Sequence, residues 1–352
     1  SGGSATEDGD QSETLTITND ESAPQASLSS TGGASEDGGT STLTATLSGV
    51  TYQDVSVVIN QYGGTGVLNT DYSLSSSTIT ILAGNTTGTI TLTCIDDSLF
   101  SGDMTMSLEV ASVSGGGASE NGTQTTGINC QDDESAPTVN LTTSANSILE
   151  NAGSSLTLTA TLSTATIADV VVNLATSGTS TNGTDYGSLS SITVSAGDTT
   201  GTALFTPTDD STYEGDETAI IDIDTIVATG TSASENGTQQ VTITITENES
   251  APTVTLATSA NSILENAGSS LTLTATLSTA SISDTTISFA TSGTSTNGTD
   301  YGSLSSITVS AGDTTGTTSF TPTDDSIYEG DETAIIDIDT VSGLATENST
   351  PQ

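Results

Sequence analysis

The sequence predicts an all-β protein of tandem, seven-stranded, immunoglobulin-like sandwiches, and two observations carry this prediction. First, apolar residues alternate with Thr or Ser in segments such as SLTLTATLS (155–163), DVVVNLAT (169–176) and VTITIT (241–246). Period-two alternation is typical of half-buried strands, and no amphipathic helical pattern of useful length occurs. Second, ENAGSSLTLTATLST occurs at 150–164 and again at 265–279, an offset of 115 residues. This period suits whole β-sandwich domains better than the short units of a solenoid.

Each repeat offers about seven strands, separated by turns rich in Gly, Asn and Asp. A diverged first copy carries EDGGTSTLTATLS at 36–48, and the short joint ESAP recurs at 21–24, 134–137 and 249–252. We therefore expect domains at 21–134, 135–249 and 250–352, joined semi-rigidly because the linkers are short and end in Ala-Pro. In the second domain the predicted strands are 138–142, 155–163, 168–176, 188–195, 200–206, 218–224 and 240–246.

The two ends of the sequence do not match the repeat. The third copy runs through DETAIIDIDT (331–340) to SGLATENSTPQ without the closing VTITIT strand, so we expect an incomplete last domain. Residues 1–20 instead contain TLTIT, with Leu15 and Ile17 at the positions of Ile243 and Ile245. We predict that this orphan strand completes the last domain of another copy, giving a head-to-tail homopolymer by strand addition. The alternative is a slice of a longer array, cut out of frame with its domains.

The charge of the chain excludes several classes of function. It has 44 Asp and Glu residues and no Lys, Arg or His, for a formal charge of −44. Nucleic-acid binding and attraction to anionic lipid need a cationic surface, and Ser-His-Asp or Cys-His catalysis needs an imidazole. No apolar run approaches the roughly 20 residues of a membrane span, so we expect no direct membrane insertion. We expect no enzyme; a hydrolase using paired carboxylates is the remaining catalytic alternative.

Clustered acids point to bound cations. PTDDSTYEGDE (207–217) returns as PTDDSIYEGDE (322–332), with five carboxylates in each copy. Crowded carboxylates repel one another, and Ca²⁺ is a hard cation that takes six to eight oxygen ligands. The plainer interpretation is an acidic loop that is merely solvated. We favour the cation because no side chain of this protein can supply positive charge.

The order of motifs resembles the Calx-beta domain. These motifs are ENAG, LTATLS, GTDY, a strand ending in AGD, DDSxYEGDE and a closing VTITITENE strand. The resemblance covers nearly the whole chain, most weakly in the first copy, and implies seven-stranded sandwiches that bind Ca²⁺ at one tip. Such domains occur in sodium–calcium exchangers, integrin subunits and bacterial surface and adhesion proteins.

The resemblance also implies ligand positions. In the second domain these are Glu150, Asp185, Asp209, Asp210, Glu214, Glu217, Glu247 and Glu249; in the third they are Glu265, Asp300, Asp324, Asp325, Glu329 and Glu332. The first domain keeps Glu36, Asp71, Asp96, Asp97, Asp132, Asp133 and Glu134. Because Ser101 and Met104 replace Glu214 and Glu217 there, we expect fewer or weaker ions. At a polymer junction, Asp20 and Glu21 of the donor would supply the acids that the third domain lacks.

Cys94 and Cys130, the only cysteines, align with Pro207 and Ile245 near the ends of two strands. We expect a disulfide, which an oxidising extracellular setting would favour; two buried free thiols are the alternative.

Asn-x-Ser/Thr acceptor sequences for glycans lie at Asn85, Asn121, Asn140, Asn182, Asn236, Asn248, Asn297 and Asn348, about as many as chance gives in so Ser- and Thr-rich a chain. The sequence thus predicts a structural subunit of an extracellular, calcium-stabilised filament. The alternative is a calcium-rigidified stalk or binding segment of a cell-surface adhesin.

Overall fold

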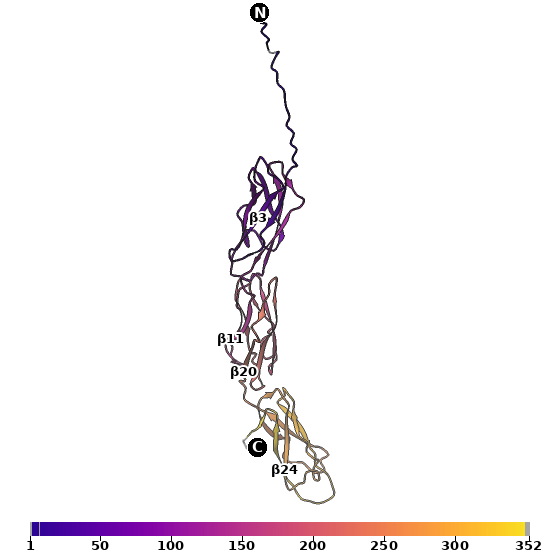
Figure 1. The fold of residues 1–352 in the computed structure, drawn as a ribbon. Helices are drawn as coiled ribbons and strands as arrows, with labels where there is room; N and C mark the ends of the chain where they lie inside the picture. Colours follow the sequence, from indigo (N-terminus) through magenta and orange to yellow (C-terminus); the bar gives the residue numbers. More distant parts are fainter. Residues whose placement is uncertain (1, 7, 349–352) are drawn as a thin grey trace. The chain divides into compact units, whose positions relative to one another are not determined.

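The computed structural model describes residues 2–6 and 8–348, and within these ranges it contains β-strands and no helix (Figure 1). No helix among the described residues therefore has the length and hydropathy of a membrane span. The chain divides into two compact units, Ser1–Ala136 and Pro137–Gln352, and the second unit contains two sandwiches. The prediction of a tandem, all-β sandwich protein is confirmed.

The first sandwich consists of two five-stranded sheets. One has the order β5 (Tyr72–Leu74), β7 (Thr87–Cys94), β3 (Thr40–Leu47), β1 (Gln25–Ser30) and β9 (Ser119–Glu120). The other has the order β2 (Ala34–Ser35), β10 (Thr125–Gln131), β8 (Met104–Ser114), β4 (Val55–Gly64) and β6 (Thr78–Ile81). Alternate residues of the long strands, such as Leu43, Val57 and Leu108, are fully buried between the sheets. The period-two pattern of the sequence thus becomes the inner face of each sheet.

The second sandwich repeats this plan. One sheet has the order β16 (Thr200–Phe205), β13 (Leu156–Leu162), β11 (Thr138–Thr143) and β19 (Ser234–Glu235). The other has the order β12 (Ser147–Leu149), β20 (Gln240–Thr246), β18 (Glu217–Ala228), β14 (Val170–Gly178) and β15 (Ser191–Val194). The seven predicted strands are present, although 188–195 shortens to β15 and 218–224 lengthens to β18. The short strands β12 and β19 were not predicted.

The closing strand β20 lies between two neighbours. It pairs in parallel with β12, where Ile148 is opposite Ile245, and antiparallel with β18, where Ala219 is opposite Ile243. Both Ile243 and Ile245 are buried in the core. The last strand of the repeat is therefore an integral part of the sheet.

The third sandwich has no such closing strand within residues 2–6 and 8–348. One sheet has the order β26 (Thr315–Phe320), β22 (Leu271–Leu277), β21 (Thr253–Thr258) and β28 (Thr346–Glu347). The other contains only β25 (Ile307–Val309), β24 (Thr285–Gly293) and β27 (Ala334–Ser342), so β27 forms its edge. Residues 262–264, at the position of β12, are not a strand. Among residues 2–6 and 8–348, no strand therefore stands at the position of β20 in the third sandwich.

The chain before β1 forms no strand in residues 2–6 and 8–24, and Figure 1 draws it as an indigo trace without arrows. Leu15 and Ile17 are 93% and 97% exposed. Two apolar side chains thus stand in solvent at positions whose counterparts in β20 are buried. In the isolated chain the predicted donor segment is extended but unpaired.

Candidate metal centres

The acidic end of each sandwich is the end where the Asp of the D-Y pair meets the D-D loop, and in the first two sandwiches the exit of the closing strand lies there as well. Tyr186 of the D-Y pair is fully buried, which fixes the preceding Asp185 at this end. Thr181 N donates a hydrogen bond of 2.6 Å to Asp185 Oδ2, and the same bond joins Val67 to Asp71 and Thr296 to Asp300. In each D-Y pair, the buried Tyr thus holds the backbone of the preceding Asp in place and so positions its carboxylate.

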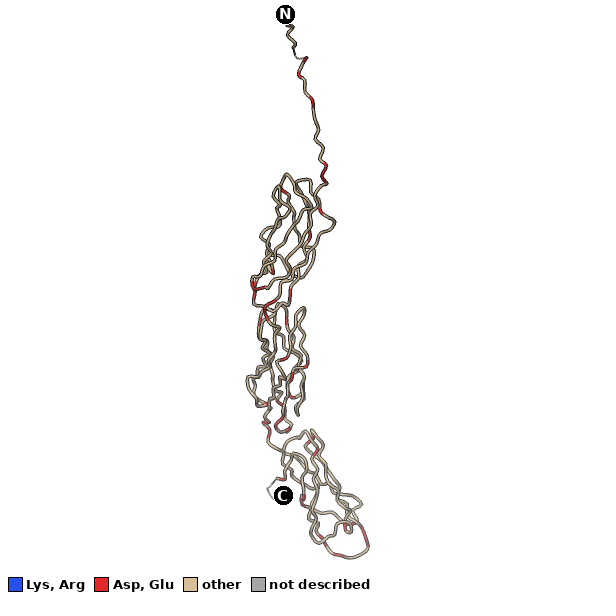
Figure 2. Tube along the Cα trace, in the orientation of Figure 1, with Lys and Arg blue, Asp and Glu red and all other residues tan. Residues whose placement is uncertain are grey.

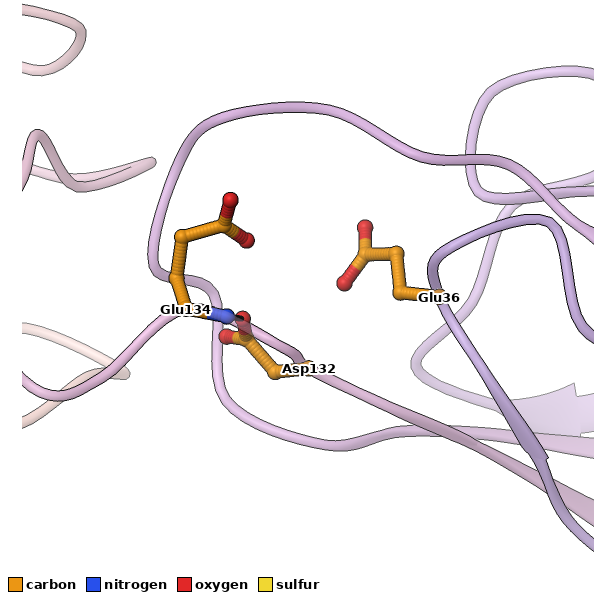
Figure 3. Close-up of side chains that lie close together, drawn as sticks. All are labelled: Glu36, Asp132 and Glu134. Carbon is orange, nitrogen blue, oxygen red and sulfur yellow. Dashed lines mark hydrogen bonds between the residues drawn. The ribbon is translucent and has the colours of Figure 1, made fainter.

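In the first sandwich Glu36, Asp132 and Glu134 come together, and each has a carboxylate oxygen within 4.8 Å of the others. Figure 3 shows the three carboxylates turned toward one another. Their meeting follows from the sheet, because β2 and β10 pair in parallel, with Gln131 opposite Ser35, and the three acids follow the ends of these strands. Parallel strands end at the same edge, so residues that are distant in sequence meet there.

Glu36 is the most telling member of this group. It is only 4% exposed, and no hydrogen bond to its carboxylate occurs among the described residues. Glu134 Oε2 is likewise buried without a partner there. Burial, followed by the charges of Asp97 and Asp132, raises the pKa of Glu36 to about 7. A buried carboxylate without a donor is costly unless a proton or a cation neutralises it, so these residues fit a bound cation.

Asp132 has a second role that sequence reasoning missed. Its Oδ2 accepts hydrogen bonds from the backbone N–H groups of Ser101, at 2.7 Å, and Gly102. Glu247 does the same in the second sandwich, where Glu214 N and Gly215 N donate to Oε2 at 2.6 and 2.9 Å. The exit of the closing strand is thus tied to the acidic loop. The sequence feature that could have indicated these hydrogen bonds is the Gly that follows position 101 or 214.

Hydrogen bonding sets Glu247 apart from its neighbours. Burial raises the pKa of this carboxyl, but N–H donation from Glu214, Glu249 and Gly215 outweighs burial and lowers the pKa to about 2. Glu247 therefore stays charged at any physiological pH, and it adds to the repulsion felt by the other acids around it.

The second sandwich contains two groups of acids. Glu150, Glu247 and Glu249 form one group, and Asp185, Glu214 and Glu217 form the other. Residues of both groups line a single small hollow together with Gly215 and Ile245. Burial, reinforced by neighbouring carboxylates, raises the pKa values of Glu150, Glu214 and Glu217 to about 7. This is the richest concentration of oxygen ligands in the described residues.

The third sandwich retains one of these two groups, Asp300, Glu329 and Glu332. Glu265, at the position of Glu150, is exposed and accepts a hydrogen bond of 2.9 Å from Asp325 N. Glu247 and Glu249 have no counterparts among the described residues of this sandwich. The group that depends on the closing strand is therefore the one that is missing.

The remaining predicted ligands lie outside these groups. Asp97, Asp210 and Asp325 each accept a hydrogen bond of 2.6 Å from a backbone N–H two residues ahead, which shapes the D-D loop. Asp20 and Glu21 lie on the unpaired N-terminal segment. The others outside the groups are Asp71, Asp96, Asp133, Asp209 and Asp324.

Cys94 and Cys130 form a disulfide with a Cα–Cα distance of 5.9 Å. The bond joins the end of β7 to β10, close to the acidic end of the first sandwich, and so links the two sheets.

The ligand chemistry of the clusters is purely carboxylate. No part of the tube in Figure 2 is blue, since the chain has no Lys or Arg. Oxygen-only groups suit hard cations such as Ca²⁺, whose six to eight ligands can include carboxylates, backbone carbonyls and water. A cation bound at these groups would hold loops from both sheets together at the acidic end.

Comparison with protein families gives three consecutive matches to the Calx-beta domain, at residues 20–134, 132–249 and 247–350. These matches cover nearly all of the chain and confirm the resemblance seen in its motifs. The comparison with curated protein sequences gave no match.

Solved structures include similar chains at low identity. CBD12 from CALX1.2 is 15% identical over 64% of this chain and 100% of its own, with a TM-score of 0.30. The D0-D1 domain of intimin is 15% identical over 64% and 100%, with a TM-score of 0.23. The Yersinia pseudotuberculosis adhesin InvE is 17% identical over 64% and 59%, with a TM-score of 0.25.

Proposed function

Because the chain belongs to the Calx-beta family, we propose that it is a structural subunit of an extracellular, calcium-stabilised filament. Subunits join head to tail when the N-terminal segment of one copy enters the third sandwich of the next. The observation that carries this proposal is the edge strand β27: among the described residues no strand pairs with the edge that corresponds to the β20-facing edge of β18. We call this unpaired edge of β27, together with residues 262–264 at the position of β12, the slot.

The residues around the slot are less buried than their counterparts. Ala219 and Ile221 of β18, which pairs with β20 in the same sheet, are fully buried, whereas Ala334 and Ile336 of β27 are only half-buried. Ile335 on the same strand is exposed. An edge strand with apolar neighbours readily pairs with another extended segment, so the slot can accept one.

The N-terminal segment has the sequence that the slot requires. Residues 13–24 read ETLTITNDESAP, and residues 241–252, which include most of β20, read VTITITENESAP. If the register of β18 with β20 holds at the junction, Leu15 lies opposite Ala334 and Ile17 lies opposite Glu332. Both apolar side chains would then enter the core, and Thr14, Thr16 and Thr18 would face outward.

The energies involved explain why cations matter. Burying Leu15 and Ile17 contributes about 1.5–3 kcal/mol each, while association costs roughly 4–15 kcal/mol in lost freedom. New main-chain hydrogen bonds between the donor segment and β27, together with burial of the slot residues, offset part of the remaining cost of association. Two chains of charge −44 also repel each other. Divalent ions at the acidic ends would remove much of that repulsion.

The register also refines the expected ligands at the junction. Asn19 falls at the position of Glu247, Asp20 at that of the exposed Asn248, and Glu21 at that of Glu249. Glu21 and Asn19, rather than Asp20, would then complete the group that begins with Glu265. With an amide in place of one carboxylate, this group carries one negative charge fewer than its counterpart in the second sandwich.

An extracellular location is supported by the disulfide, since such bonds persist in oxidising compartments. A second candidate function is a calcium-rigidified stalk or binding segment of a cell-surface adhesin. It is favoured by Glu134 and Glu249, which belong to the ESAP joints and also to the metal groups. A cation bound there would fix each joint to the preceding sandwich whether or not chains assemble.

Electron microscopy of the purified chain tests the proposal. We expect filaments in millimolar Ca²⁺ and their loss with a chelator. The variant Ile17→Asp, which places a charge in the slot, should give single rods at the same Ca²⁺ concentration, and Thr16→Asp, which faces outward, should still assemble. Single rods from the unaltered chain under all conditions would favour the stalk.

A further inference from the structure

The second unit contains a contact between its two sandwiches that is separate from the slot. The acidic loop of the second sandwich forms a short strand, β17 (Thr212–Tyr213), which pairs in parallel with β23 (Ala280–Ser281) of the third. Thr212 lies opposite Ala280, and Ile282 N donates a hydrogen bond of 3.2 Å to Tyr213 O. This main-chain bridge fastens the loop after β16 to the loop after β22.

Each half of this bridge has an exposed counterpart elsewhere in the chain. In the third sandwich Ile327 and Tyr328 stand at the positions of Thr212 and Tyr213 and are 65% and 96% exposed. In the first sandwich Val50 and Tyr52 stand at the positions of Ala280 and Ile282 and are 63% and 84% exposed. Four large apolar side chains in solvent thus stand at the positions of the two halves of the contact between β17 and β23.

The loop of the first sandwich already has the shape of its counterpart. Thr51 O accepts a hydrogen bond of 2.9 Å from Gly84 N, as Ser281 O does from Gly312 N. Both Thr51 and Ser281 are buried, so the backbone on either side is held in the same way. No rearrangement is needed for residues 50–51 to act as a bridging strand.

The joint at a polymer junction has the same length as the internal one. Residues 247–252 connect β20 to β21, and residues 19–24 connect the donor segment to β1; both joints end in ESAP. A donor segment seated in the slot would therefore place the first sandwich of its own chain beside the acidic loop of the acceptor. This step rests on the proposed function.

We propose that the two loops carrying these exposed side chains meet across each junction. Ile327–Tyr328 of one copy forms a parallel bridge with Val50–Thr51 of the copy whose N-terminal segment fills the slot. The occupant is a second copy of this chain, because the complementary surface is present on the chain itself. Val50 and Ile327 are larger and more apolar than Ala280 and Thr212, so the intermolecular bridge buries more apolar surface than the internal one. It is a contact without charge in an otherwise repulsive molecule.

Paired cysteine variants test this contact directly. In the double variant Val50→Cys, Ile327→Cys, mild oxidation during assembly should join successive copies and give a ladder of covalent multimers. The matched control is Thr212→Cys, Ala280→Cys, which should close within one chain and give no ladder. Mass spectrometry of the digested bands identifies the cysteines joined and confirms that Cys94 remains bonded to Cys130.

The outcomes separate this inference from the proposed function. A ladder containing the 50–327 bond supports the contact. Filaments that form normally without a ladder, while the control closes, overturn the contact and leave strand donation standing. Failure of the control to close would remove the internal bridge on which the contact is based. Absence of filaments from the unaltered chain would overturn both proposals.

Discussion

Replacing Ile17 by Ala should weaken assembly without affecting the stability of the subunit. Ile17 is almost fully exposed in the single chain, and its counterpart Ile245 is buried in the core. Truncating a buried Ile to Ala costs about 2–5 kcal/mol. At 1.4 kcal/mol for each factor of ten, the protein concentration at half-assembly should rise from about 30-fold to several thousand-fold.

Sedimentation of filaments over a dilution series at fixed Ca²⁺ concentration measures this shift. Thr16→Ala is the matched control, since Thr16 faces outward in the same register and surface changes usually fall within about 0.5 kcal/mol. Ile245→Ala is a second control, which should lower the unfolding temperature of the second sandwich, whereas Ile17→Ala should leave every unfolding transition of the dispersed subunit in place. Equal half-assembly concentrations for Ile17→Ala and Thr16→Ala would show that the N-terminal segment does not enter a core.

Three further predictions concern the acidic ends and the disulfide. In the ion-free protein, four carboxyl groups have folded pKa values of about 7, above the ordinary 4.5: those of Glu36, Glu150, Glu214 and Glu217. Their protonated forms therefore contribute stability that is complete below pH 4.5 and is lost as the pH rises through 7. Calorimetry should therefore find the ion-free chain more stable at pH 5 than at pH 8, and saturating Ca²⁺ should reduce or reverse the difference; equal stabilities without Ca²⁺ would contradict the pKa shifts. Glu36→Gln should remove most of the calcium-dependent stabilisation of the first sandwich, about 2.7 kcal/mol at 100 times Kd, and leave that of the second unchanged; an unaltered calcium response of the first sandwich would exclude Glu36 as a ligand. Reduction of Cys94–Cys130, which are separated by 36 residues, should destabilise the first sandwich alone by about 4 kcal/mol, and a Cys94→Ser, Cys130→Ser variant should show the same loss and no response to reductant.

The strands were predictable because their burial is periodic. Segments such as 155–163 and 241–246 alternate without interruption, so the choice of inner face leaves no ambiguity. The short strand β12 was not predictable in this way, because three residues are too few to show an alternation of apolar and polar side chains. It exists because β20 offers an unpaired edge beside Ile148, which is a property of the sheet and not of the local sequence.

The candidate site was predictable in composition but not in grouping. Spacing and family resemblance indicated Glu150, Glu214 and Glu247 as acids of one end, and the structure brings them to one hollow. Sequence could not show that Glu247 is held by backbone donors while Glu36 has none, because this depends on how the loop at Gly102 or Gly215 is turned. The bridge between β17 and β23 was also invisible, since Thr212–Tyr213 has no strand pattern of its own.

The position of β20 determines how the second sandwich responds to pulling. Tension applied through the joint at 247–252 acts along the length of β20, which is bonded on one side to β12 and on the other to β18. Under such shear the ladder bonds on both sides resist together, and they do not open one after another as in an unzipping hairpin. The bonds from Glu214 and Gly215 to Glu247 hold the strand where the load enters. Mechanical strength is thus built into the last strand of the repeat.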